Sequence, residues 1–346
     1  MLRFFAALWV VFAHQHIFWK WIQAPLLEPV RRVLDRGDCA VKLFFVLSGF
    51  ILTHVYARKA TFSRKSFYRA RFARIYPLYA ASLALALPCL VFFEIPREIH
   101  GHGQIHGFLF AGLKAASVLL LLQSWVPSFA PFWNPVAWSL SAEAFFYLLF
   151  PKLIRHLRER STGSLLGVGL ACLVVEAVRW HFFSELYTRS ADKVQTAFWV
   201  FTPILRLPDF VTGILLGVLW QRGIRLQPRH SFAALALVVL GCMATPLETF
   251  QIACLHLGTA GLISSLAFSG SPSSRWVRAG VLLGRSSYAL YLIHEPVSYW
   301  FAVLSARIVG FQPPYPVYLG FVVFLSVLAF TWVETPARNL LREGSA

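Results

Sequence analysis

Acidic residues are scarce in this 346-residue chain, which has 15 Asp and Glu against 32 Lys and Arg. Charged residues of all kinds make up 14% of it, whereas about 25% is usual for a soluble domain. Hydrophobic residues reach 58%, so most elements must be buried in lipid or against other apolar helices. The composition excludes an ordinary soluble protein and predicts a polytopic membrane protein.

Cysteine is also rare, with five residues and no CxxC pair. Four of them lie in apolar stretches and Cys39 lies at the start of another, so neither a disulfide framework nor a cysteine metal site is expected. Three histidines in HGHGQIH, at positions 100, 102 and 106, have the side chains to chelate a metal. Because that stretch is rich in glycine, we expect an exposed polar loop and no metal site.

Several enzyme signatures are absent. The chain has no GxSxG elbow, no HExxH and no HxxxD of the kind soluble acyltransferases use. No repeat relates residues 1–173 to residues 174–346, which counts against a transporter built from duplicated halves.

The net charge of +17 comes from short basic segments between apolar spans. This is the pattern of the positive-inside rule, so we expect a multi-pass protein of the inner (plasma) membrane and no nucleic-acid binding. The segments read as cytoplasmic are residues 57–77, 152–160, 222–229, 275–278 and the tail with Arg338 and Arg342. The mixed stretch 185–193 is read as external, and both termini are expected in the cytoplasm.

Eleven apolar segments follow one another along the chain. They are residues 1–19, 40–56, 78–93, 108–125, 136–150, 165–180, 198–220, 232–245, 252–268, 281–304 and 317–332. Because both ends are read as cytoplasmic, the number of crossings must be even, and one segment between Leu78 and Phe150 is expected to be partial or re-entrant. We therefore expect an all-α bundle of about ten transmembrane helices, forming one integral-membrane domain over residues 1–346 without a fused soluble domain.

The first span, MLRFFAALWVVFAHQHIFW, contains Arg3 and His14. Eleven residues apart, they lie about 20° out of register on one helical face and roughly 16 Å apart. Ionisable groups inside a bilayer are costly and tend to mark function, although His14 could simply bond a neighbouring helix. The small residues at 11–13 also resemble a signal-peptide cleavage site, but a retained helix suits these polar residues better.

Two further sites have ionisable side chains. Arg71 and Arg74 in RFARIYP lie one helical turn apart before Pro77 and can face one anionic ligand, or serve as a topological anchor. Glu143 stands in the middle of the span WSLSAEAFFYLLF and needs a partner such as His14, an arginine or a ligand. Alternatively, Glu143 pins two helices together.

Hydroxyl and imidazole groups recur in LLGRSSYALYLIHEP. Ser287, Tyr291 and His294 are spaced by four and three residues, so they share one helix face and can line a cavity. His294 could equally be a packing histidine. Ser48 and Ser139 are also assigned to the cavity lining, and Gly49 beside Ser48 should allow another backbone to approach closely.

Five sequence blocks together resemble the acyltransferase family 3 membrane proteins. These are the arginine and histidine separated by ten residues (Arg3 and His14), KLFFVLSGFIL, RFARIYP, WSLSAEAFFYLLFP and LGRSSYALYLIHEP, in the family's order over residues 3–296. The resemblance implies about ten transmembrane helices. It also implies transfer of acyl groups, commonly acetyl from acetyl-CoA, to sugar hydroxyls of glycans or glycosylated molecules.

The resemblance also implies roles for single residues. His14 matches the family's essential histidine, Arg3 its paired arginine, Arg71 and Arg74 the pair linked to the acyl donor, and Glu143 the glutamate of its block. Phe4 departs from the glycine that often follows the arginine. Because no esterase-like domain is fused to the chain, a separate protein would have to serve as any acceptor-side partner.

The expected chemistry uses acyl-CoA as co-substrate and no permanently bound cofactor. His14 would remove the proton of a sugar hydroxyl, Glu143 would orient the ring, and the arginines would hold the CoA phosphates. Transient acylation of His14 is an alternative route. The alternative function is a transporter or flippase in which His14 and Glu143 relay protons, and a membrane scaffold ranks third.

Overall fold

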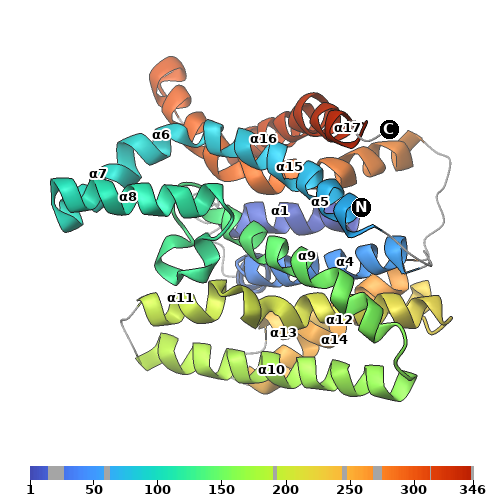
Figure 1. Ribbon diagram of the computed structural model, residues 1–346. Helices are drawn as coiled ribbons and strands as arrows, with labels where there is room; N and C mark the ends of the chain where they lie inside the picture. The colour runs from blue at the N-terminus through green and yellow to red at the C-terminus, as the bar shows by residue number, and fades with distance from the viewer. Residues whose placement is uncertain are drawn as a thin grey trace. The chain divides into compact units, whose positions relative to one another are not determined.

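The computed structural model describes residues 1–14, 27–57, 63–189, 193–243, 248–267, 275–311 and 313–343, and these are helical with short connections (Figure 1). No strand occurs among them, so the all-α prediction is confirmed. The α-helices are α1 (Leu2–His14), α3 (Glu28–Leu34), α4 (Gly37–Tyr56), α5 (Arg64–Leu85), α6 (Leu87–Cys89), α7 (Ile95–His102), α8 (Gln104–Leu119), α9 (Trp138–Leu157), α10 (Thr162–Arg189), α11 (Lys193–Phe201), α12 (Pro203–Gln221), α13 (Ser231–Met243), α14 (Glu248–Leu266), α15 (Arg275–Leu304), α16 (Tyr315–Ala329) and α17 (Thr335–Glu343).

Shorter turns complete the description. Three-residue 3₁₀ turns η3 (Gln123–Trp125), η4 (Pro127–Phe129) and η5 (Pro135–Ala137) connect α8 to α9, and η6 (Pro228–His230) precedes α13. Three π-helical segments interrupt or extend helices: η2 (Leu90–Glu94), η7 (Ser305–Val309) and η8 (Phe330–Glu334). π-helical turns often occur at functional sites, and η8 contains the buried Glu334.

The chain divides into two compact units, each assembled from distant parts of the sequence. The first unit comprises Met1–Lys20, Lys65–Ser141 and Arg278–Ala346, and the second comprises Trp21–Arg64 and Ala142–Val277. The single domain over residues 1–346 stays a prediction.

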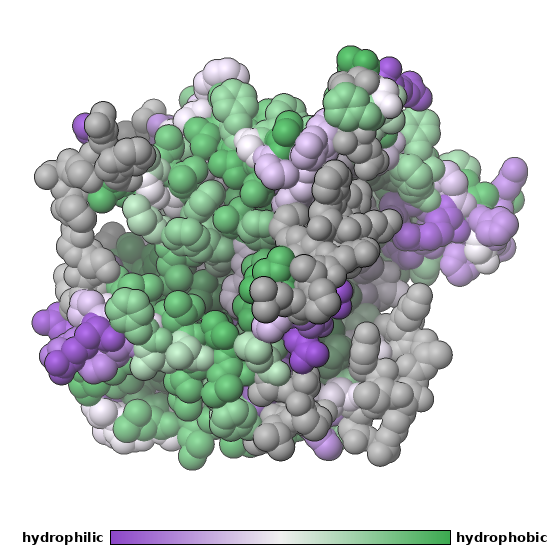
Figure 2. Space-filling model, turned by 180° about the vertical axis from the view of Figure 1, so that it is seen from behind, coloured by the Kyte–Doolittle hydropathy of each residue, from purple (hydrophilic) through white to green (hydrophobic). Residues whose placement is uncertain are grey.

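Four segments in the described part are long and apolar enough to cross a membrane. They are Gly37–Tyr56, Thr162–Ser184, Thr196–Gln221 and Tyr315–Leu341, and shorter apolar helices occur at Leu2–His14, Pro228–Met243 and Phe250–Leu266. Figure 2 shows apolar side chains over much of one face, as expected for a surface that contacts lipid. The polytopic helical class is confirmed, whereas the number of about ten spans stays a prediction.

A bent helix pair forms a fifth possible span. Arg64–Leu85 and Leu87–His102 meet at an angle of 52°. Pro88 lies in the first turn after the bend, where its missing N–H prevents an uninterrupted helix. The bend falls between Leu78 and Phe150, the stretch for which a partial or re-entrant crossing was predicted.

Two segments predicted as loops between apolar spans are largely helical. The basic segment 57–77 enters α5 at Arg64, and Pro77 lies inside this helix. The HGHGQIH stretch forms the end of α7 and the start of α8, joined at Gly103, whose φ of +80° suits glycine. Part of the first predicted span, residues 15–19, and the basic residues Arg58 and Lys59 lie outside the described residues.

Close backbone packing organises the second unit. A Cβ added at Gly49 of α4 would lie 2.2 Å from the Phe210 carbonyl oxygen of α12, and one at Gly213 would lie 1.9 Å from the Val46 oxygen. Only glycine therefore fits at this crossing. The close approach predicted at Ser48 and Gly49 is confirmed, with α12 as the partner.

Candidate functional site

Two histidines of the first unit meet at the end of α1. The Nδ1–H of His14 donates to the Val10 carbonyl at 2.9 Å, and that of His294 donates to the Tyr291 carbonyl at 2.8 Å. A carbonyl only accepts, so in the neutral form of each ring the proton lies on Nδ1 and Nε2 keeps a lone pair. His14 is exposed and His294 is completely buried, so the pair joins an accessible base to an enclosed one.

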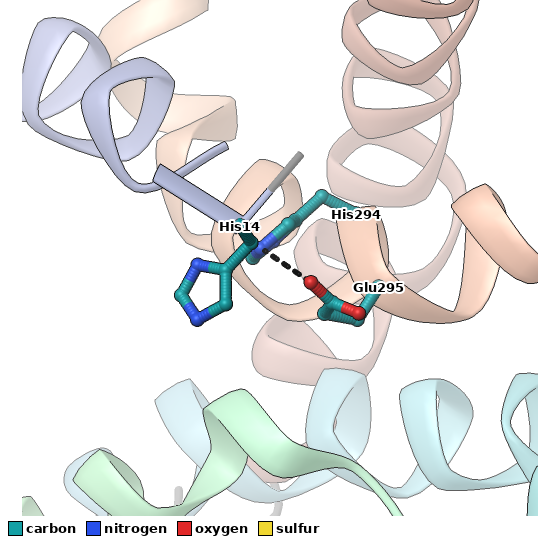
Figure 3. Close-up of side chains that lie close together, drawn as sticks. All are labelled: His14, His294 and Glu295. Atoms are coloured by element: carbon teal, nitrogen blue, oxygen red, sulfur yellow. Dashed lines mark ion pairs between the residues drawn. The ribbon is translucent and has the colours of Figure 1, made fainter. Parts of the chain in front are cut away.

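Glu295 completes this cluster. Its Oε1 lies 3.8 Å from the His294 Nε2, and one ligand atom from each of the three residues lies within 4.8 Å of the others (Figure 3). The His294 Nε2 has no hydrogen-bond partner among the described residues, although it is buried. An orphaned buried nitrogen beside an accessible imidazole indicates a place where a ligand's hydroxyl or a proton can be accommodated.

The same three side chains offer donors that a metal accepts. Two imidazole nitrogens and one carboxylate match the ligand types of zinc sites. Within the described ranges, no other group of three such residues was found. The sequence predicted no metal here, and a chelator control in activity assays addresses that prediction directly.

Side chains of neighbouring segments hydrogen-bond to the backbone of α15 beside His294 and fix its position. The Tyr318 hydroxyl donates to the His294 carbonyl at 2.9 Å, and the Asn134 amide donates to the Leu292 carbonyl at 3.1 Å. Met1 packs against the open side of Gly280, which places α1 against α15. These contacts hold His294 and Glu295 in a defined position next to α1.

The hydroxyl groups predicted to line a cavity are engaged with protein. Ser139 and Tyr291 hydrogen-bond each other at 2.8 Å, and the Ser287 hydroxyl donates to the Gly284 carbonyl at 2.9 Å. The Tyr291 hydroxyl also donates to the Val136 carbonyl at 2.9 Å. The bonds of Tyr291 attach α15 to η5 and to the start of α9, whereas the Ser287 bond lies within α15. A role of these hydroxyl groups in lining a cavity stays a prediction.

Arg3 lies on α1 with His14, as the first span predicted. Its Nε is buried and has no hydrogen-bond partner among the described residues. A cationic side chain with an unused buried donor is suited to an anion.

Arg74 of α5 forms an ion pair with Glu334 of η8, which is 1% exposed at its side chain. Its guanidinium also lies over the Tyr288 ring, 5.1 Å from the ring centroid, and Arg338 approaches the same carboxylate at 3.9 Å. Arg71 lies over the Phe67 ring at 5.9 Å. The predicted donor-binding arginine therefore already has a carboxylate partner, and two arginines flank one negative charge.

Glu143 belongs to the second unit and bonds hydroxyl groups there. Its Oε1 accepts from Ser48 of α4 at 2.8 Å and from Tyr147 of its own helix α9. The carboxylate thereby joins two helices, which was the structural alternative. Its proposed action on His14 stays a prediction.

A buried charge cluster in the second unit was missed by the sequence reasoning. The Lys42 ammonium of α4 contacts Glu176 of α10 at 3.0 Å and also Asp209 of α12. Arg179 contacts Glu176 at 3.0 Å and donates to the Trp199 carbonyl. Glu176 and Asp209 each stand in a predicted apolar span, and that was the signal that could have identified them.

Glu295 and Glu334 were also missed. Glu295 directly follows His294 in LIHEP, and Glu334 stands at the end of the apolar span TWVE. A carboxylate in an apolar segment requires a partner, so both were detectable as candidates. Which residues would be their partners was not detectable from spacing.

Comparison with known proteins identifies relatives over almost the whole chain. A family model described as "Acyltransferase domain" matches residues 1–333. The chain is 29% identical to "Acyltransferase MdmB" of Streptomyces mycarofaciens, over 98% of this chain and 91% of that protein. It is 27% identical to "Nodulation protein 10" of Rhizobium leguminosarum bv. viciae, over 98% and 92%.

A third relative is longer than this chain. "O-acetyltransferase OatA" of Staphylococcus aureus is 23% identical over 98% of this chain but only 56% of its own length. No solved structure matches.

Proposed function

The chain belongs to the acyltransferase family whose model spans residues 1–333, and from this membership we propose a specific reaction for it. The protein transfers an acyl group, acetyl in the simplest case, from acyl-CoA to a hydroxyl of a sugar or glycan acceptor. The observation that carries the proposal is the His14 ring. Its Nδ1 is held by Val10, its Nε2 has no hydrogen-bond partner among the described residues, and His294 and Glu295 lie beside the ring.

His14 acts as the general base. The acceptor hydroxyl gives its proton to the His14 Nε2 as its oxygen attacks the thioester carbonyl carbon. A C–O bond forms, the C–S bond breaks, and the proton passes from the imidazolium to the departing CoA sulfur. The Val10 carbonyl holds the ring in the tautomer that this step requires.

His294 and Glu295 support the charged intermediate form of His14. The carboxylate of Glu295 stabilises a positive charge that develops on the neighbouring imidazole. The lone pair of the His294 Nε2 offers a hydrogen-bond acceptor for the incoming hydroxyl. A route in which His14 is acylated first uses the same nitrogen as nucleophile.

The arginines bind the donor. Arg3, Arg71 and Arg74 supply guanidinium groups suited to the phosphates of CoA. Arg338 is a fourth candidate, because it approaches the carboxylate that pairs with Arg74. The name of the Staphylococcus aureus relative, an O-acetyltransferase, supports an oxygen acceptor. The basic segments support a cytoplasmic donor side.

The test measures CoA thiol released from acetyl-CoA by the protein in nanodiscs, with an extract of cell-surface glycans as acceptor. His14→Ala should reduce acceptor-dependent turnover by roughly a hundredfold or more, since it removes the base. His100→Ala, at an exposed histidine of α7, is the matched control and should retain turnover. A chelator added to the wild type should have no effect.

Two results would contradict the proposal. Undiminished turnover by His14→Ala would remove His14 from the reaction. The second result comes from wild-type protein reconstituted in closed vesicles. If it moves a glycan or lipid across the membrane and never releases CoA, the transporter alternative is favoured.

A further inference from the structure

An apolar groove of about 640 Å³ lies in the first unit between α5, α15 and α16. These three helices lie side by side in Figure 1. Its walls include Leu78, Val297, Phe301, Leu325 and Trp332, and Ser82 and Ser305 supply its few polar atoms. The volume falls in the range of sites that take whole small ligands, of about 300–1,000 Å³, and far exceeds the space for a two-carbon group.

One end of the groove lies beside the arginine site. Arg74, Leu78, Ala81 and Leu85 follow one another at spacings of four, three and four residues, so they share one face of α5. On the opposite wall, Trp332 and Val333 line the groove immediately before Glu334, the partner of Arg74. The apolar surface is therefore continuous with the charged group of Arg74, Glu334 and Arg338.

The groove also borders the helix turn that presents the reactive cluster. Ile293 and Val297 line it, and His294 and Glu295 lie between them in sequence on α15. From the other side, Tyr318 holds the His294 carbonyl while Phe321, one turn later on α16, lines the groove. One helix thus has reactive groups on one side and an apolar wall on another.

We propose that this groove binds the acyl chain of the donor, and that the protein accepts acyl-CoA donors with chains longer than acetyl. The proposal rests on the proposed function and widens its donor class. An acyl-CoA is an apolar chain joined to a head with several phosphates, and the groove joins an apolar wall to two arginines. The bond changes are unchanged, because only the chain on the thioester carbonyl differs.

The test compares donors of increasing chain length that remain soluble in water: acetyl-, butanoyl- and octanoyl-CoA. For each donor, kcat/KM is measured by CoA thiol release with the same glycan acceptor. Each buried methylene can contribute roughly fourfold to binding. Even if the groove buries only part of the octanoyl chain, kcat/KM should be about tenfold or more higher for octanoyl-CoA than for acetyl-CoA.

Variants locate the effect in the groove. Ala81→Trp places a large ring in it and should lower the octanoyl-to-acetyl ratio of kcat/KM by about tenfold. Ala80→Trp is the matched control, because Ala80 is its exposed neighbour outside the groove, and it should keep the wild-type ratio. Ala329→Trp fills the groove from the opposite wall and serves if the first variant does not fold.

The outcomes separate this inference from the function on which it rests. Two results overturn the groove proposal and leave the proposed transferase activity standing. One is turnover of acetyl-CoA without a preference for octanoyl-CoA. The other is an octanoyl-to-acetyl ratio of kcat/KM that stays unchanged in both Ala81→Trp and Ala329→Trp. No turnover with any donor overturns the proposed function itself. Native mass spectrometry tests for a bound phospholipid. If the wild type and Ala80→Trp carry one, Ala81→Trp does not, and the octanoyl-to-acetyl ratio of kcat/KM is the same in all three, the groove binds a bilayer lipid. That result also overturns the proposal.

Discussion

The rings of His14 and His294 meet edge to face, with centroids 5.3 Å apart and an interplanar angle of 61°. Both rings have Nδ1 committed to a backbone carbonyl, so neither Nε2 has a proton to offer the other. Each Nε2 can instead accept a hydrogen bond from a hydroxyl that enters the site. Two neutral imidazoles and one carboxylate together suit a site that receives a single proton during turnover.

Replacing the carboxylate of this cluster should slow catalysis without weakening donor binding. We expect Glu295→Gln to lower kcat for acetyl-CoA by roughly tenfold to a hundredfold, because the charge that stabilises the imidazolium is lost. KM for acetyl-CoA should stay within about twofold. Steady-state kinetics of CoA release measure both.

The control is Glu159→Gln, which changes an exposed glutamate in the turn after α9 and should behave as the wild type. A Glu295→Gln protein with a raised KM and an unchanged kcat would show that Glu295 acts in binding.

The ion pair between α5 and η8 should matter for donor affinity. Glu334→Gln removes the buried carboxylate that neutralises Arg74 and lies near Arg338, so that charge no longer competes with a phosphate for the two guanidinium groups. We expect a lower KM for acyl-CoA together with a lower Tm, since the half-buried Arg74 loses its ion pair.

Arg74→Gln should act in the opposite direction on affinity and raise KM. Thermal unfolding in detergent and CoA-release kinetics, each with Glu28→Gln at an exposed pair as control, separate the two effects. An unchanged KM in both variants would show that the pair only joins helices.

The charge cluster around Lys42 should be the most sensitive part of the second unit. Lys42→Met leaves Glu176 and Asp209 buried without the ammonium between them, at a cost of about 3–5 kcal/mol. Chemical denaturation in detergent micelles should report the loss. Lys152→Met, at an exposed lysine of α9, should cost little and supplies the comparison. Equal stability of the two variants would disprove a structural role for the cluster.

The crossing of α4 and α12 should not tolerate a methyl group. Gly213→Ala forces its Cβ onto the Val46 carbonyl oxygen, so the helices must separate, and we expect a loss of several kcal/mol. Gly167→Ala on α10 is matched in chemistry but faces open space, and should be neutral or slightly stabilising. Thermal unfolding followed by size-exclusion of the surviving protein measures the difference.

The amino-acid sequence alone determined the class of the molecule. Its shortage of acidic residues and its recurring apolar segments predicted a polytopic helical membrane protein, and the local periodicity placed Arg3 and His14 on one helix. Ser48 and Gly49 correctly marked a close helix contact. These features depend on composition or on residues within a few turns, which is the range over which sequence pattern has physical meaning.

Only the tertiary structure decided the partners. Glu295 joins His14 across 281 positions, Glu334 reaches Arg74, and Lys42 reaches Asp209 167 residues along the chain. It also showed that the helix of RFARIYP begins at Arg64 and continues through Pro77, and that HGHGQIH forms two helix ends joined at Gly103. Periodicity says which face of a helix is polar, but which other helix packs against that face is set by the packing of the whole chain.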